Sequence, residues 1–298
     1  MKKAFVTGGL GFVGFHLVQR LLLEGIEVIV VDEITDEKKE VQEEMWMRMG
    51  RNDLATLLNE KVKNIDLATV LKDVDMIYHL AATTSSDSKW SKLVKVIENN
   101  VNLTKKLVKA IPDHASFIYA STVEVYGERP GLITERTPTN PTSAYGITKL
   151  ASERLIQKEC SERGITYTIL RLPTIYGPWQ RSDMTYQQII LGKKNPEIDR
   201  STLDVLYVDD CIDAFLLAAN IKQKNEIFHL TSGQEDAWYE GIRFLGCREI
   251  KKVSKIKTTL SSDKSNSLLG FRPKTPLDKG LAKQREHVKQ WQNQQRLS

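Results

Sequence analysis

The sequence predicts an α/β protein built on a doubly wound parallel sheet, and three observations support this class. The chain opens on a short apolar strand that ends in a glycine-rich turn. Apolar runs of strand length then alternate with segments of helical periodicity. Small and polar residues follow the ends of several strands. Because ligands of such sheets bind beyond the carboxyl ends of the strands, one site is expected there.

The first element reads AFVTGGLGFVG and leads into a helix with one apolar face. Gly8 permits a tight turn, Gly11 lets the backbone approach a pyrophosphate, and Gly14 lets the helix pack closely. The helix start, with Phe12 and Val13, offers N–H groups and a positive dipole end to phosphates. An ordinary turn is the alternative. The strand before and the helix after favour dinucleotide binding.

A second strand is expected at 27–31, and it ends at Asp32. The spacing of Asp32 from the glycines is close to that of an acid that hydrogen-bonds the adenosine ribose. Glu33 follows and would repel a 2′-phosphate, so the sequence favours NAD over NADP. A third strand is expected to end near Asp66 and Leu67, which would contact the adenine.

Further strands are expected at 75–80, 116–122 and 166–172, and helices at 93–110 and 144–163. This alternation predicts parallel strands joined by crossover helices. Small residues after the strand at 75–80 let a cofactor lie against its end, and the expected contacts are Leu80, Ala81 and Ala82. Thr84 follows as an expected substrate contact. His79 lies inside an apolar strand, which favours a satisfied core histidine over a catalytic one.

The domain organisation follows from these elements. Residues 1–172 are predicted to form the NAD-binding domain, to which the chain returns around 204–230. Residues 173–203 and 231–298 would form a small, shortened substrate-binding lid over the carboxyl edge of the sheet. A basic helix is expected from about Leu277.

The composition is that of an ordinary soluble protein, with 41% hydrophobic and 27% charged residues. The net charge of +5 is too mild and dispersed to indicate nucleic-acid binding. The isolated Cys160, Cys211 and Cys247 have no metal-ligand spacing and suit a reducing cytosol. No signal peptide, membrane span or metal site is expected, and the predicted location is cytoplasmic.

Tyr145 and Lys149 lie four residues apart on a predicted helix, so they share one face. Tyrosine is a poor base near neutral pH, with an ordinary pKa of about 10. The lysine ammonium and a nicotinamide ring are expected to lower that pKa. Tyr145 would then take a proton from a substrate hydroxyl as hydride leaves the carbon, while Thr122 hydrogen-bonds the same hydroxyl. A surface helix pair is the alternative, and the glycine-rich turn upstream favours catalysis.

A series of segments between residues 7 and 210 carries a family pattern: TGGLGFVG from Thr7, HLAA from His79, NV from Asn100, STVEVYG from Ser121, YGITK from Tyr145, LR from Leu170, YGP from Tyr176 and YVDD from Tyr207. With these segments the chain resembles an extended short-chain dehydrogenase/reductase of the NAD-dependent nucleotide-sugar epimerase/dehydratase family. The resemblance implies a Rossmann-type fold, tightly held NAD and oxidation of a nucleoside-diphosphate hexose or uronate to a 4-keto intermediate. It also implies a homodimer through helices 93–110 and 144–163. Pro173 is an expected cofactor contact and Thr174 an expected substrate contact.

Glu124 bears on the subclass. Family dehydratases and decarboxylases carry Thr-(Asp or Ser)-Glu at this strand end, and this chain has Thr122, Val123 and Glu124. A 4-ketone acidifies the C5 proton, so the Glu124 carboxylate would abstract it and start elimination. Val123 cannot supply the acid that a dehydratase uses beside this base. The alternative is that Glu124 only hydrogen-bonds substrate or faces the lid.

Arg181 favours epimerisation, because the run PWQRSDM around it resembles uronate- and glucose-type 4-epimerases. Arg181 would form a bidentate contact with a substrate anion. A solvent-exposed loop arginine is the alternative. The lid departs from the family, since Leu203 stands where an arginine for the diphosphate is expected. The basic residues that would have to compensate are Arg200, Lys252, Lys255 and Arg272.

The leading interpretation is therefore an NAD-dependent nucleotide-sugar enzyme in which 4-epimerisation is favoured. A 4,6-dehydratase or decarboxylase-like enzyme that uses Glu124 is the second interpretation. A non-catalytic NAD-binding or regulatory protein, or a scaffold partner, is the third, prompted by the altered lid. The presence of Thr122, Tyr145 and Lys149 argues against the third.

Overall fold

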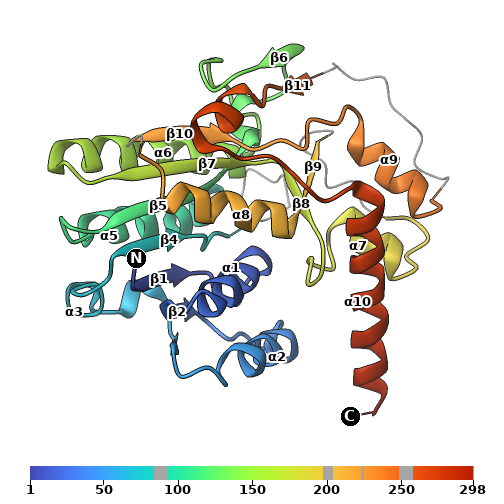
Figure 1. Cartoon of the computed structure of the whole chain (residues 1–298), viewed down its shortest axis with the longest axis horizontal. Helices are drawn as coiled ribbons and strands as arrows, with labels where there is room; N and C mark the ends of the chain where they lie inside the picture. The colour runs from blue at the N-terminus through green and yellow to red at the C-terminus, as the bar shows by residue number, and fades with distance from the viewer. Residues whose placement is uncertain (84–92, 197–203, 223–224, 248–257, 298) are drawn as a thin grey trace.

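The computed structural model describes residues 1–83, 93–196, 204–222, 225–247 and 258–297 (Figure 1). In these residues a seven-stranded parallel sheet has the order β10-β7-β5-β4-β1-β2-β3. Its strands are β1 (Lys3–Thr7), β2 (Glu27–Asp32), β3 (Ala55–Asn59), β4 (Met76–His79), β5 (Ser116–Thr122), β7 (Tyr167–Leu172) and β10 (Glu226–His229). The order reverses between β1 and β4, which is where doubly wound sheets bind ligands. The predicted fold class is confirmed.

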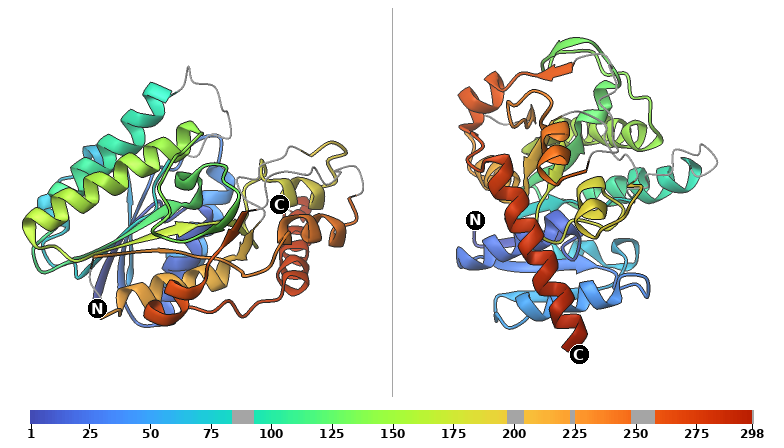
Figure 2. Two further views of the ribbon diagram at one scale, coloured as in Figure 1. Left: turned by 90° about the horizontal axis from the view of Figure 1, so that it is seen from above. Right: turned by 90° about the vertical axis from the view of Figure 1, so that its right-hand side faces the viewer.

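Helices cover both faces of this sheet (Figure 2). One face packs against α1 (Phe12–Leu23), α2 (Lys39–Met49) and α8 (Val208–Ala219). The other packs against α3 (Leu67–Val70), α5 (Leu103–Lys109) and α6 (Ala144–Arg163), and α4 (Leu93–Ile97) packs against α6. A π-helical turn, η3 (Glu98–Asn102), joins α4 to α5, and a short 3-10 turn, η1 (Val62–Asn64), follows β3.

The side chains of each strand alternate between two hydrophobic cores, one on each face of the sheet. Ala4 and Val6 of β1 belong to the core under α1 and α8, whereas Phe5 belongs to the core under α5 and α6. Successive strand side chains point to opposite faces, so each strand anchors both helical layers. The sheet is therefore packed between two helical layers.

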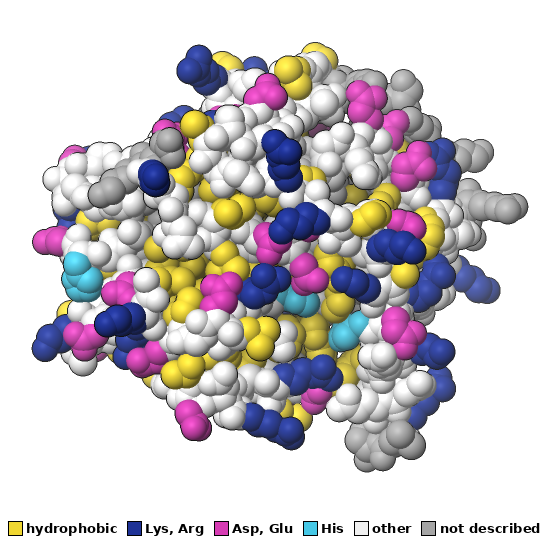
Figure 3. Space-filling model, viewed as in Figure 1, with side chains coloured by type: hydrophobic (Ala, Val, Ile, Leu, Met, Phe, Trp, Pro, Cys, Tyr) yellow, Lys and Arg dark blue, Asp and Glu magenta, His cyan; other side chains and the backbone are white. Residues whose placement is uncertain are grey.

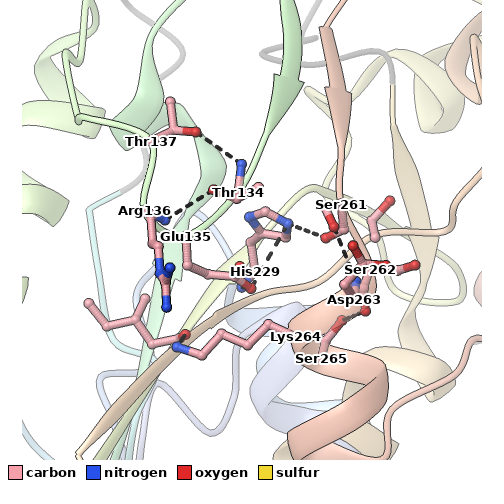
Figure 4. Close-up of polar contacts among 12 residues, drawn as sticks. Thr134, Glu135, Arg136, Thr137, His229, Ser261, Ser262, Asp263, Lys264 and Ser265 are labelled. Carbon is pink, nitrogen blue, oxygen red and sulfur yellow. Dashed lines mark hydrogen bonds and ion pairs between the residues drawn. The ribbon is translucent and has the colours of Figure 1, made fainter.

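The remaining elements lie at and beyond this edge (Figure 1). They are η4 (Val123–Tyr126), β6 (Gly131–Ile133), β8 (Thr174–Tyr176), α7 (Thr185–Ile190), β9 (Val205–Tyr207), α9 (Ala237–Phe244), β11 (Thr258–Leu260), η5 (Ser265–Leu269) and α10 (Leu277–Leu297). β8 pairs with β9, and β6 pairs with β11. His229, at the end of β10, connects this region to the sheet: its backbone N–H donates to Glu135 Oε1 at 3.1 Å, and its Nε2 donates to the Ser261 carbonyl (Figure 4).

The predicted third strand is wrong. β3 ends at Asn59, and Asp66 instead caps α3, since its carboxylate accepts from Ala68 N at 3.2 Å and Thr69 Oγ1 at 2.7 Å. The sequence signal of β3 is weak because this edge strand is only partly buried and has no continuous apolar run. The helix expected at 144–163 is confirmed as α6.

Charged side chains are dispersed, with basic and acidic groups interspersed on the face in Figure 3. Within the described residues, no helix is long and apolar enough to cross a membrane. Cys160 and Cys211 are buried thiols and Cys247 is half-buried. The described part of the chain also holds no cluster of three or more His, Cys, Asp or Glu arranged for a metal ion.

Candidate active site

The glycine-rich turn after β1 meets the loop after β4 at the point where the strand order reverses. Gly8 has a φ of +74°, and its N–H donates to Val31 O at 2.8 Å. A Cβ placed on Gly8 would lie 2.8 Å from the backbone nitrogen of Ala81. Only glycine satisfies both the backbone angle and this close approach.

Gly14 seats α1 directly on this turn. A Cβ on Gly14 would lie 2.0 Å from Gly8 O, whereas one on Gly11 would lie 3.1 Å from the same atom. Gly11 is the N-cap of α1, and this end has no side-chain cap and no acidic residue in its first turn. Phe12 and Val13 are half-buried there. The turn thus fits a dinucleotide pyrophosphate, because it combines a close backbone approach with uncapped N–H groups.

Asp32 braces the same turn from the end of β2. Its Oδ2 accepts from Leu10 N at 2.9 Å and its Oδ1 accepts from Glu33 N at 2.9 Å. Burial raises the pKa of this carboxyl group. Asp66 is exposed and bonds its own helix start, and Leu67 is buried behind it. The structure therefore brings Asp32, and not Asp66, into contact with the glycine turn.

His79 is a core residue, as predicted. Its Nδ1 lies 2.8 Å from Thr7 Oγ1 and its Nε2 lies 3.0 Å from Thr104 Oγ1. Full burial lowers the pKa of His79 to about 3, so the ring is neutral. Its two hydrogen bonds connect β1, β4 and α5 beneath the turn.

Asn100 holds the loop that follows β4. Its Oδ1 accepts from Thr83 N at 2.8 Å, and its Nδ2 donates to Thr83 O at 3.2 Å and to Thr148 Oγ1 at 3.2 Å. The loop residues predicted to contact the cofactor are half-buried beside it: Leu80, Ala81 and Ala82. Sequence reasoning used Asn100 only as part of the family segment NV and gave it no role of its own. Thr84 lies outside the described residues.

Lys149 is buried against the end of β5. Its Nζ donates to Ala120 O at 2.6 Å and lies 4.6 Å from the Tyr119 ring centroid and 5.6 Å from that of Tyr145. Burial lowers the pKa of Lys149 to about 7, and the negative charge of Glu153 opposes this lowering. The ammonium is therefore only partly charged near neutral pH.

Tyr145 faces a different pair of charges from those predicted. Burial and the nearby charge of Glu124 raise the pKa of Tyr145, and Arg181 lowers it. Burial outweighs the lowering that was expected from Lys149, because Lys149 is itself desolvated and donates to Ala120 O. Tyr145, Glu124 and Arg181 thus act on one another within one site.

Thr122 and Glu124 lie at the carboxyl end of β5. Thr122 is buried, and its Oγ1 accepts from Glu124 N at 3.2 Å. Ser143 Oγ donates to Glu124 Oε2 at 2.5 Å and accepts from Gly146 N at 3.0 Å, so Ser143 also caps α6. Burial raises the pKa of Glu124. Sequence reasoning placed Ser143 in the loop before the helix, where a serine is a capping signal, but did not predict its contact with Glu124.

A buried ion pair supports this end of β5. Arg171 Nη2 donates to Glu153 Oε2 at 2.6 Å, and Arg171 Nε and Ser121 Oγ donate to Glu153 Oε1 at 3.0 and 2.5 Å. Sequence reasoning missed Glu153, although its position one helical turn beyond Lys149 places it on the same face of the helix. Tyr126, at the end of η4, donates to His229 Nδ1 at 3.2 Å. These contacts fix η4, and with it Thr122 and Glu124.

Arg181 lies on the loop after β8 and is about one-third exposed. Its Nε and Nη2 donate to the two carboxylate oxygens of Asp183 at 2.9 and 3.0 Å. Pro173 and Thr174 are buried where β8 begins. Arg272 is exposed before α10. The other residues predicted to bear on a diphosphate lie outside the described part of the chain: Arg200, Leu203, Lys252 and Lys255.

We expect Lys149→Met to stabilise the fold below about pH 7. The folded-state pKa of about 7 lies below the ordinary 10.5, so the unfolded chain binds more protons between these values. The wild type therefore gains stability relative to the variant as pH rises through that window. Thermal unfolding across this pH range measures the difference. Lys158→Met, at an exposed position of α6, is the control and should show no such trend. A wild type at least as stable as Lys149→Met at acidic pH would contradict this account.

A comparison with protein families matches residues 4–230 to the NAD dependent epimerase/dehydratase family. The chain is 34% identical over 221 residues to an uncharacterized UDP-glucose epimerase of Bacillus subtilis, YtcB, covering 70% of each protein. It is 28% identical over 261 residues to a UDP-N-acetyl-α-D-glucosaminuronate decarboxylase of Bacillus cytotoxicus, covering 80% of this chain and 78% of the relative.

Among solved structures, the chain is similar to a UDP-glucuronic acid 4-epimerase from Bacillus cereus in complex with UDP-glucuronic acid and NAD. The TM-score is 0.83 at 29% identity, and the match covers 97% of this chain and 99% of the other. The region matched includes the glycine turn, Tyr145 and Lys149. NAD is accordingly the cofactor that the turn and Asp32 would hold.

Proposed function

The chain belongs to the NAD-dependent epimerase/dehydratase family, and on that premise we propose that it is a UDP-sugar 4-epimerase whose substrate is a uronate. The observation that carries the proposal is the place of Arg181, about one-third exposed on the loop after β8 and near enough to Tyr145 for its charge to lower the pKa of that hydroxyl. A guanidinium near the proposed base suits a sugar that carries a carboxylate. The similar epimerase of Bacillus cereus, crystallised with UDP-glucuronic acid and NAD, supports the same assignment.

In this proposal Tyr145 takes the proton from the 4-hydroxyl, and Thr122 Oγ1 hydrogen-bonds the same oxygen. Bound NAD supplies the hydride acceptor for C4 and a positive charge that lowers the pKa of Tyr145. Arg181, whose Nε and Nη2 donate to Asp183 in the structure, exchanges this partner for the sugar carboxylate. The keto sugar would then turn over and take the hydride back on its opposite face, while Tyr145 returns its proton to the oxygen of the inverted carbon. Lys149 donates to Ala120 O and Glu153 accepts from Ser121 Oγ, so both residues hold α6 against β5.

The test is incubation of the purified protein with UDP-, dTDP-, GDP- and CDP-hexoses and uronates, with products identified by mass spectrometry and proton NMR. We expect a product of unchanged mass with inverted C4 from a UDP-uronate. Loss of water or of carbon dioxide would replace the proposal by the second candidate below. No conversion of any of these sugars by the NAD-bound protein would favour the non-catalytic interpretation.

The second candidate, a dehydratase or decarboxylase-like enzyme, is favoured by one observation, the half-buried carboxyl group of Glu124 beside Tyr145. The contact with Ser143 gives this carboxyl group a structural partner as well. A base for C5 needs only the oxygen that Ser143 does not occupy.

For an epimerase we expect Glu124→Gln to change the rate of C4 inversion by less than about tenfold, because the amide oxygen still accepts from Ser143. The NMR assay in deuterated water measures the rate and the labelling of C5 together. Wild-type enzyme that labels C5, combined with a variant that does not, would assign the C5 base to Glu124 and overturn the epimerase.

We extend the proposal to a homodimer formed through the helices α4, α5 and α6. On α4, Val94 is 67% exposed and Ile97 is 37% exposed, which leaves apolar side chains at the surface. Light scattering of the purified protein tests this assembly, and a monomeric mass would refute it.

A further inference from the structure

The loop that carries Arg181 rests on the C-terminal helix. We call residues 177–184 the arginine loop; it connects β8 to α7. In Figure 1 α10 runs beside α7 and the end of β8. Gln284, in the first half of α10, is fully buried at this contact. A fully buried amide is retained where its hydrogen bonds are satisfied, so its partners identify its role.

Gln284 satisfies its amide with three groups of the loop and of α7. Its Oε1 accepts from Gly177 N at 3.1 Å. Its Nε2 donates to Gln180 Oε1 at 2.8 Å and to Gln187 Oε1 at 2.9 Å. One side chain thus joins the first residue of the arginine loop, its middle and the following helix.

Two further hydrogen bonds hold the arginine loop in place. Gln180 is buried, and its Nε2 donates to Ile175 O of β8 at 2.8 Å. Gln188 Nε2 donates to Asp183 O at 2.6 Å at the far end of the loop. Arg181 and its partner Asp183 therefore lie between two anchored points.

A second contact with α10 lies in the same loop. Trp179 is buried, with its ring centroid 4.4 Å from that of His287 and 5.1 Å from that of Trp291. Its backbone has a φ of +66°, which a tryptophan rarely adopts. Surrounding contacts must hold this conformation, and those with α10 lie one and two helical turns beyond Gln284.

We propose that Gln284 is a positioning residue for Arg181, through which the C-terminal helix sets the preference of the site for an anionic sugar. The substrate part of this inference rests on the proposed function. The placement of the loop does not, since it follows from the hydrogen bonds of Gln284 alone. Loss of Gln284 leaves the buried Gly177 N–H and Gln180 amide oxygen without this partner, which favours movement of the loop into water.

Gln284→Leu tests the placement directly, because leucine fills similar space and removes only the hydrogen bonds. Gln292→Leu is the matched control, since Gln292 is exposed on the same helix. Hydrogen exchange of the NAD-bound protein, without sugar nucleotide, follows the peptide that contains the arginine loop. We expect faster exchange there in Gln284→Leu alone, with the peptide of the glycine turn unchanged. Wild-type exchange in the arginine loop would overturn the proposal.

The effect on preference is measured by titrating UDP-glucuronic acid and UDP-glucose into wild type, Gln284→Leu, Arg181→Ala and the double variant. We expect each single variant to lose about 10-fold to 100-fold of the preference for the uronate. The double variant should lose no more than Arg181→Ala, because Gln284 acts through Arg181. A merely structural glutamine would lower thermal stability without changing the ratio of the two affinities.

Failure of the uronate substrate and failure of the positioning role of Gln284 give different results. A wild type without preference for the uronate, whose arginine loop still loosens in Gln284→Leu, would refute the uronate substrate and leave the positioning of the loop standing. Additive losses in the double variant would show that Gln284 does not act through Arg181, and the positioning role would then be rejected.

Discussion

Tyr145→Phe should lower the turnover of the sugar nucleotide by about 10²-fold to 10⁴-fold, the range that a positioned acid or base contributes. The phenyl ring keeps the packing of the first turn of α6, and Lys149 keeps its bond to Ala120 O. Only the hydroxyl that would exchange the proton is lost. NAD affinity should stay within about threefold of wild type, because no contact of the glycine turn changes.

Steady-state rates and a titration with NAD together measure this outcome. Tyr167→Phe is the control, since Tyr167 lies at the opposite, amino end of β7. Its loss of a hydroxyl should leave turnover near wild type. Turnover by Tyr145→Phe at the wild-type rate would reject Tyr145 as the base, whereas loss of NAD binding would show that its hydroxyl supports the cofactor site.

The elements predicted accurately have strong local signals at both ends. α6 begins after Ser143, whose side chain accepts from Gly146 N, and it ends before Gly164, which has a left-handed backbone. β5 is an apolar run buried along almost its whole length. β3 has neither a cap nor a buried run, so its position follows from pairing with β2, which no local pattern records.

The same contrast holds in the site. Residues at strand ends, and residues four apart on one helix, are brought together by local geometry and are predictable. Gln284 meets Gly177 across 107 positions of the chain, and one glutamine in a polar helix carries no signal for such a contact. The sequence predicts that a charged Lys149 lowers the pKa of Tyr145. It does not show the desolvation that lowers the pKa of Lys149 itself and so reduces its charge near neutral pH.

Two glycine-to-alanine substitutions in the turn separate the packing of α1 from the binding of NAD. Gly14→Ala places a methyl group 2.0 Å from Gly8 O, a contact with backbone that no rotamer relieves. We expect it to lower the free energy of unfolding by about 3 kcal/mol without NAD and to displace the N-terminus of α1. Gly11→Ala meets the same oxygen at 3.1 Å, which a shift of a few tenths of an ångström relieves. Its effect on unfolding should stay within about 1 kcal/mol.

Gly11→Ala should affect NAD affinity more than stability, because its methyl group occupies the turn where the pyrophosphate would approach the backbone. We expect Gly11→Ala to weaken NAD by about 10-fold to 100-fold in a protein of nearly normal stability. Thermal unfolding of the cofactor-free proteins and calorimetric titration with NAD measure the two effects separately. If Gly14→Ala unfolds like wild type, the close packing of α1 on Gly8 does not support the fold. If Gly11→Ala binds NAD normally, the pyrophosphate does not lie against this turn, and the cofactor site must be placed elsewhere along the carboxyl edge of the sheet.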